Sequence, residues 1–148
     1  MNPYSKARGW KPHYNESEQP EENVLLMVEQ VVLDTRQSLP KEFSNKIENV
    51  ALIVTDWPTQ EQVRLLNLHP GYLLFGLYQG IPRPQKPFTN YLHPDKITIF
   101  SGPIMAITRS WSEMKEKIKN TTLHEIAHYF GLSESQIKSV EKAKGVSY

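Results

Sequence analysis

Residues 121–135 read TTLHEIAHYFGLSES, which places two of the five histidines of the chain four residues apart. The stretch ends a longer run without Gly or Pro that begins at Ser110-x-x-Glu113, a capping box in which each side chain can bond a backbone N–H at a helix start. Gly131 suits the left-handed residue that closes many helices. Between these ends, core-type residues recur every four positions: Met114, Ile118, Thr122, Ile126 and Phe130. The pattern predicts one long helix that ends at Gly131.

The other predicted elements make an α+β pattern. A helix is expected to start at Pro20, Glu21 and Glu22 and to stop at Ser38-Leu39-Pro40. Ser133-x-x-Gln136 is a second capping box and predicts a short final helix with Ile137 and Val140. Hydrophobic runs bounded by turn residues predict a buried strand at 49–57, further strands at 72–80 and 96–102, and a short helix at 59–68.

Composition bounds the domain organisation and the partners. The chain has 148 residues, which predicts a single domain, with residues 1–19 as a flexible N-terminal arm and 20–148 as the folded domain. With 17 Lys+Arg against 16 Asp+Glu and no cysteine, neither a nucleic-acid partner nor a disulfide or thiolate metal site is expected. The polar start and the short apolar run VLLMVEQVVL predict no membrane span, and we expect a soluble cytoplasmic protein.

The two histidines have the spacing of a metal-binding pair. On one helix His124 and His128 lie about 40° apart around the axis and ~6 Å apart along it, so both rings can reach one zinc ion. Glu125 lies ~60° around from His128, where its carboxylate can hold a water without being a ligand. This is the division of roles in an H-E-x-x-H metallopeptidase, with the glutamate as general base. The alternative is two exposed histidines on a helix, and the agreement of spacing, helix start and glycine stop favours the metal site.

A catalytic zinc ion usually has a third protein ligand. A left-handed turn at Gly131 would fold the chain back under the histidines, and Glu134 is the first ionisable residue after that turn. We therefore predict Glu134 as the third ligand, although an acidic residue at a helix start is also favoured by the helix dipole alone. Weaker candidates are Glu141, His69, His93 and Asp95.

A group that stabilises the transition state is not identified by the sequence. Tyr129 projects ~120° away from the histidine face, so we expect it in the core or behind the ligands. Three residues of the loops could reach the site and are not ranked: Tyr91, Arg83 and Arg109.

Five segments resemble, in order, the small bacterial metallopeptidase-like proteins called minimal zincins: SLPKEF, NVALIVTDWP, FGLYQGIP, PDKITIF and TTLHEIAHYFGLSES, within about residues 24–138. The resemblance implies a single compact zincin-like α+β domain, with a small mixed sheet packed on a long active-site helix. It implies that His124 and His128 bind the metal and that Glu125 is the general acid and base. The family commonly has aspartate where this chain has Glu134, and the loop RPQKPF departs from the more polar segment usual there.

Together these features predict a zinc-dependent metallopeptidase that acts on a peptide or protein substrate. The first alternative is a non-catalytic metal-binding or partner-binding module that keeps the zincin-like shell around the metal. The intact Glu125 argues against it, because a purely structural site has no need of a base. The second is a nucleic-acid binder that uses Lys6, Arg8 and Lys11, which the net charge of +1 disfavours.

Overall fold

The computed structural model describes residues 21–47, 49–68, 72–82 and 95–144, and the predicted arm at 1–19 lies outside these ranges. The elements follow in the order α1 (Glu21–Gln37), α2 (Lys41–Ser44), a 3-10 helix (Asn45–Ile47), β1 (Ala51–Thr55), α3 (Gln60–Leu65), β2 (Gly76–Gln79), β3 (Lys96–Phe100), α4 (Ser101–Ile107), α5 (Trp111–Tyr129) and α6 (Glu134–Lys144). The predicted α+β class is confirmed. No helix in the described part combines the length and apolar character needed to cross a membrane.

The described strands form one mixed sheet in the order β1-β3-β2. β1 pairs with β3 in parallel, with Ile53 opposite Thr98, and β2 pairs with β3 antiparallel, with Tyr78 opposite Ile97. The strand predicted at 49–57 exists as β1, which lies at the sheet edge. It is not a buried strand, because Ala51 and Ile53 are exposed. Sequence predicted its apolar character and not its place at the edge.

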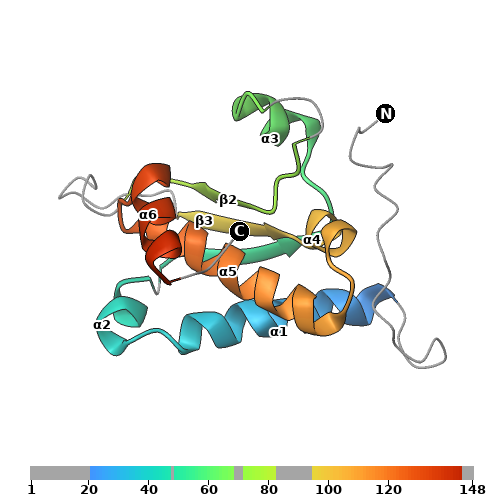
Figure 1. Ribbon diagram of the computed structural model, residues 1–148, viewed down its shortest axis with the longest axis horizontal. Helices are drawn as coiled ribbons and strands as arrows, with labels where there is room; N and C mark the ends of the chain where they lie inside the picture. The colour runs from blue at the N-terminus through green and yellow to red at the C-terminus, as the bar shows by residue number, and fades with distance from the viewer. Residues whose placement is uncertain (1–20, 48, 69–71, 83–94, 145–148) are drawn as a thin grey trace.

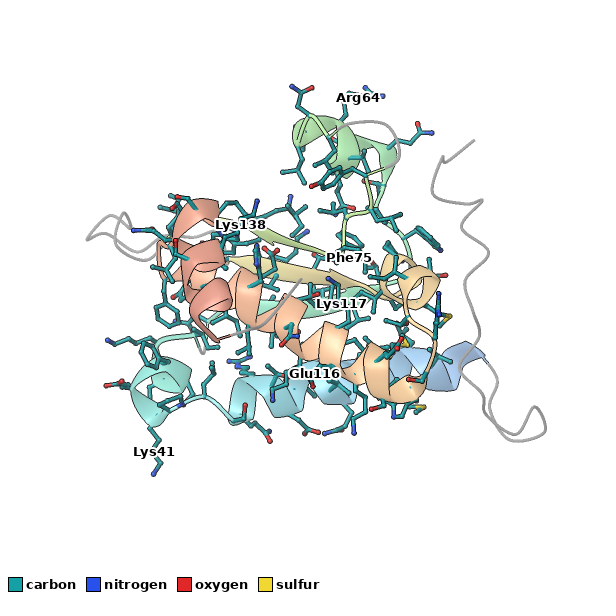
Figure 2. All side chains as sticks on the ribbon, in the orientation of Figure 1. Lys41, Arg64, Phe75, Glu116, Lys117 and Lys138 are labelled. Atoms are coloured by element: carbon teal, nitrogen blue, oxygen red, sulfur yellow. The ribbon has the colours of Figure 1, made fainter. Side chains whose placement is uncertain are left out.

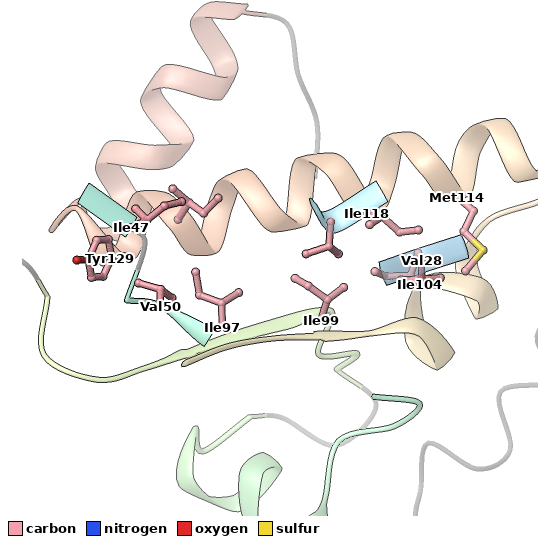
Figure 3. Packing of buried hydrophobic residues seen from close by; sticks show 11 residues of the cluster. Val28, Ile47, Val50, Ile97, Ile99, Ile104, Met114, Ile118 and Tyr129 are labelled. Carbon is pink, nitrogen blue, oxygen red and sulfur yellow. The ribbon is translucent and has the colours of Figure 1, made fainter. Parts of the chain in front are cut away.

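The hydrophobic core lies between one face of the sheet and the two long helices α1 and α5 (Figures 1 and 3). Ile97 and Ile99 of β3 point from the sheet towards the helices (Figure 3) and are fully buried. The helices supply the facing side chains at the three- and four-residue spacing expected of a buried helical face: Val28, Val32, Met114, Ile118, Ile126 and Tyr129. This packing fixes α5 against the sheet along most of its length.

The strand predicted at 96–102 ends earlier than expected. β3 stops at Phe100, and α4 begins at the next residue with Ser101, Gly102 and Pro103 in its first turn. Pro103 is tolerated there because the first N–H groups of a helix have no intrahelical acceptor. Gly102 lies against Trp57, where an added Cβ would come within 2.4 Å of the indole ring, and its N–H donates to the Asp56 carbonyl at 2.7 Å. A long-range contact therefore favours a helix in a segment whose local sequence does not predict one.

The long helix has the predicted ends. At its start the Ser110 hydroxyl accepts from the Glu113 N–H at 3.1 Å, while the Glu113 carboxylate accepts from the N–H of Arg109, one residue earlier than in a capping box. At its end Gly131 has φ 92°, and its N–H donates to the His128 carbonyl at 3.0 Å. The Leu132 N–H donates to the Ala127 carbonyl at 3.1 Å, which completes a Schellman turn.

Candidate metal centre

The histidine pair lies on the last two turns of α5. The imidazole centroids of His124 and His128 are 4.9 Å apart with the rings at 74° to one another, and the side chains are 15% and 23% exposed. The two rings therefore lean over one spot, as their four-residue spacing predicts. They are accessible enough to reach a bound ion and buried enough to hold fixed rotamers.

The Schellman turn brings Glu134 back to the histidines. The chain reverses at Gly131, and α6 starts at Glu134. The predicted capping box is present at this start: the Ser133 N–H donates to Gln136 Oε1 at 2.8 Å, and the Gln136 N–H donates to Ser133 Oγ at 3.2 Å. Oε1 of Glu134 lies 3.0 Å from Nε2 of His124 and 2.7 Å from Nε2 of His128. Two imidazole nitrogens and one carboxylate oxygen thus converge, and we call these three atoms the donor cluster.

The other nitrogen of His128 is fixed by the same turn. Nδ1 of His128 lies 3.0 Å from the carbonyl oxygen of Leu132. A carbonyl oxygen only accepts, so Nδ1 is the donor in this contact. When the ring binds a metal as neutral imidazole, its lone pair therefore lies on Nε2, the nitrogen in the donor cluster. Metal-binding histidines are commonly oriented by a hydrogen bond of this kind.

The donor cluster fits a zinc ion. Donors placed tetrahedrally at about 2.0–2.1 Å from zinc are separated by about 3.3 Å, slightly more than the 3.0 and 2.7 Å found here. Glu134 can withdraw by this small amount because 59% of its side chain is exposed. Two histidines with one glutamate are also a donor set found in catalytic zinc sites.

Glu125 lies beside the donor cluster and is buried against the sheet. It is 8% exposed, and one of its carboxylate oxygens lies within 4.8 Å of the ligand nitrogens of His124 and His128. Its carboxylate accepts a hydrogen bond from the backbone N–H of Tyr78 on β2. Glu134, and not Glu125, makes the direct contacts with both Nε2 atoms.

The two carboxylates differ in electrostatic environment. Burial raises the pKa of Glu125 above its usual value, although the charges of His128 and His124 and the Tyr78 N–H act to lower it. Burial also acts to raise the pKa of Glu134, but hydrogen bonds and charge from both histidines outweigh it, and the pKa lies below its usual value. Glu134 therefore favours the anionic form that a cation needs, while Glu125 more readily takes up a proton.

The strand beside the helix supplies contacts that sequence reasoning missed. A Cβ at Gly76 of β2 would lie 2.8 Å from Cγ2 of Thr121 and 3.0 Å from Cγ of Glu125, so only glycine allows this close approach. Just before the strand, the Phe75 ring lies 4.2 Å from Nζ of Lys117 on α5 (Figure 2). The two glycines of FGLYQG were the available signal, but which element β2 would contact depends on long-range packing.

The remaining predicted residues lie away from the donor cluster or outside the described ranges. Tyr129 is 3% exposed, and its hydroxyl donates to the Lys46 carbonyl, so it belongs to the core as expected. Asp95 is 2% exposed and accepts from the Tyr78 hydroxyl. Arg109 is exposed just before α5. Outside the described part lie His69, His93, Tyr91, Arg83 and the loop RPQKPF, together with the side chain of Glu141.

A long helix that carries H-E-x-x-H, ends in a glycine turn and packs under a small mixed sheet defines a zincin-like metal-dependent peptidase fold. A family model described as zincin-like metallopeptidase matches residues 47–143, about two thirds of the chain. The chain belongs to this family. The matched range includes the sheet, α5 and all three residues of the donor cluster. No match was found among curated proteins.

Proposed function

We propose that this protein is a zinc-dependent metallopeptidase that hydrolyses peptide bonds in a peptide or protein substrate. The observation that supports this most directly is the convergence of Nε2 of His124, Nε2 of His128 and Oε1 of Glu134, with Glu125 alongside. A site that only stabilises the fold usually has four protein ligands. A catalytic site usually has three protein ligands and an open position for water or substrate, and in H-E-x-x-H peptidases the glutamate acts as general base.

In this proposal His124, His128 and Glu134 hold the zinc ion. When bound, zinc supplies a Lewis acid that polarises a carbonyl group and lowers the pKa of a water molecule to about 7. Glu134 contributes a negative charge and the two neutral rings none, so the cluster keeps a net positive charge with zinc in place. That charge favours the developing oxyanion of a peptide carbonyl.

Glu125 is the general base and then the general acid. It takes a proton from the attacking water at its carboxylate and later donates that proton to the leaving amine. Its burial supports this assignment, because the raised pKa makes the carboxylate a stronger base than an exposed glutamate. The Tyr78 N–H keeps one face of the carboxylate occupied, which limits its rotation.

β2 is the strand along which we expect a substrate backbone to bind. The Phe100 N–H donates to the Phe75 carbonyl, so in an antiparallel ladder alternate residues Gly76 and Tyr78 direct their backbone groups away from β3. The Tyr78 N–H is bonded to Glu125, so we expect a peptide to use the backbone groups of Gly76. Gly76 also contacts Glu125. An extended peptide added to this edge would therefore pass beside the donor cluster, a common mode of peptide recognition.

The test is cleavage of a broad peptide library, followed by mass spectrometry. The zinc-loaded protein should cleave peptides, a chelator should abolish cleavage, and added zinc should restore it. Glu116→Gln is a matched control for Glu125→Gln, because Glu116 is an exposed glutamate of the same helix (Figure 2), and it should cleave like wild type. Stoichiometric zinc binding without any cleavage would instead support the non-catalytic module.

A further inference from the structure

A buried carboxylate outside the donor cluster is connected to Glu125 through a single residue. Oδ2 of Asp95 accepts a hydrogen bond of 2.6 Å from the hydroxyl of Tyr78, and Asp95 is 2% exposed. The backbone N–H of the same tyrosine donates to the Glu125 carboxylate. We propose that Tyr78 and Asp95 are positioning residues that hold Glu125 in the orientation needed for proton transfer. This inference rests on the proposed peptidase function.

Tyr78 is held from both ends. At the hydroxyl end it is bonded to Asp95, whose own backbone carbonyl accepts from the Ala51 N–H of β1 at 2.9 Å. Its ring packs edge-on against Tyr129 with centroids 6.0 Å apart, within the hydrophobic core. The side chain therefore has little freedom, and the backbone N–H of Tyr78 is fixed relative to α5.

Two glycines allow this strand to pass between the carboxylates. Gly76 and Gly80 lie two residues before and two after Tyr78, on the same side of an extended chain. A Cβ at Gly76 would lie 3.0 Å from Cγ of Glu125, and one at Gly80 would lie 2.4 Å from Oδ1 of Asp95. The backbone thus contacts the base at one end and the buried carboxylate at the other.

A tyrosine bonded to a buried aspartate can also serve stability alone. The two roles predict different kinetics. Loss of a stabilising contact lowers the melting temperature and leaves the turnover of the folded enzyme unchanged. Loss of a positioning contact lowers kcat, because misplacement of a reacting group by even 1 Å can cost about 100-fold, while substrate and zinc binding remain.

The decisive variant is Tyr78→Phe, which keeps the ring and removes the hydroxyl. Tyr129→Phe is its matched control, since that tyrosine is also buried, and the change keeps the ring that packs on Tyr78 while it removes a hydroxyl that donates to the Lys46 carbonyl. With a peptide that wild type cleaves, Tyr78→Phe should lower kcat about 10–100-fold. KM and zinc affinity should stay near wild type, and Tyr129→Phe should lose stability only.

A double variant and an exchange measurement complete the test. With Glu125→Gln already present, adding Tyr78→Phe should cause little further loss of rate, because both changes remove the same function.

By amide hydrogen exchange, the Tyr78 N–H should exchange faster in Asp95→Asn than in wild type or Tyr129→Phe, whether or not a substrate is known. Equal kcat losses in Tyr78→Phe and Tyr129→Phe, or unchanged exchange at Tyr78, would overturn the positioning role. A wild-type protein that binds zinc but cleaves no peptide would refute the proposed function and leave the exchange result to decide the contact.

Discussion

Replacing Gly76 by alanine tests the close approach of β2 to the active-site helix. The added Cβ would lie 2.8 Å from Cγ2 of Thr121 and 3.0 Å from Cγ of Glu125, both below ordinary van der Waals separation. Neither neighbour is free to move far, because Thr121 and Glu125 are both buried. The strand and helix must therefore separate by several tenths of an ångström.

The expected cost is that of overpacking a tight interface, about 1–3 kcal/mol. For a chain of this size each kcal/mol corresponds to about 2–4 °C in Tm. Catalysis should suffer more than stability, because the displaced groups include the carboxylate of Glu125. We expect kcat for a cleaved peptide to fall at least about tenfold while the protein stays folded at 25 °C.

Thermal unfolding and peptide kinetics check this prediction, with Thr121→Ser as the companion variant. The serine keeps the hydroxyl and removes Cγ2, the atom closest to the added Cβ. The double variant should be more stable than the sum of the two single losses predicts, since the two sites share one contact. Its rate should stay low, because the contact with Glu125 remains. Wild-type Tm and wild-type kcat in Gly76→Ala would refute the close approach.

The other predictions concern the metal. The protein should bind about one zinc per chain, measured by metal analysis, and should release it as pH falls, because protons compete for the two imidazole nitrogens. Glu125→Gln should retain zinc and lose hydrolysis by about 10²–10⁴-fold, measured in the peptide assay against Glu116→Gln. Glu134→Gln should weaken zinc binding strongly and Glu134→Asp much less, measured by competitive titration. Gly131→Ala should also weaken it, without adding to the Glu134→Gln effect, since a Cβ disfavours φ 92° and displaces Glu134. Wild-type affinity in Glu134→Gln would exclude that residue as a ligand.

The donor cluster follows from local sequence to an unusual degree. His124 and His128 share one helix, so their relation is fixed by helical geometry alone. Glu134 is reached through a turn that a glycine marks in the sequence, and the structure brings its carboxylate to both rings. The spacing and the glycine turn used for this prediction lie within residues 121–135, and the helix start that supports it lies at Ser110-x-x-Glu113.

The parts that sequence could not predict depend on contacts between distant segments. The role of Tyr78 requires β2 to pair with β3 and to contact α5. The residues of β2 alone predict neither the pairing nor the contact. Likewise α4 starts with Ser-Gly-Pro, a poor local helix signal, and is supported by contacts with Asp56 and Trp57. The exposure of Ala51 and Ile53 on one face of β1 likewise depends on which elements cover the sheet.

In the proposed site Glu134 binds the metal and Glu125 does not. A zinc-bound crystal structure, with the ion located by anomalous scattering, tests it most directly. We expect the ion within about 2.0–2.2 Å of both Nε2 atoms and of a Glu134 carboxylate oxygen, with the Glu125 carboxylate beyond bonding distance and still bonded to the Tyr78 N–H. Zinc bound by Glu125, with Glu134 turned away from the histidines, would exclude Glu134 as the third ligand.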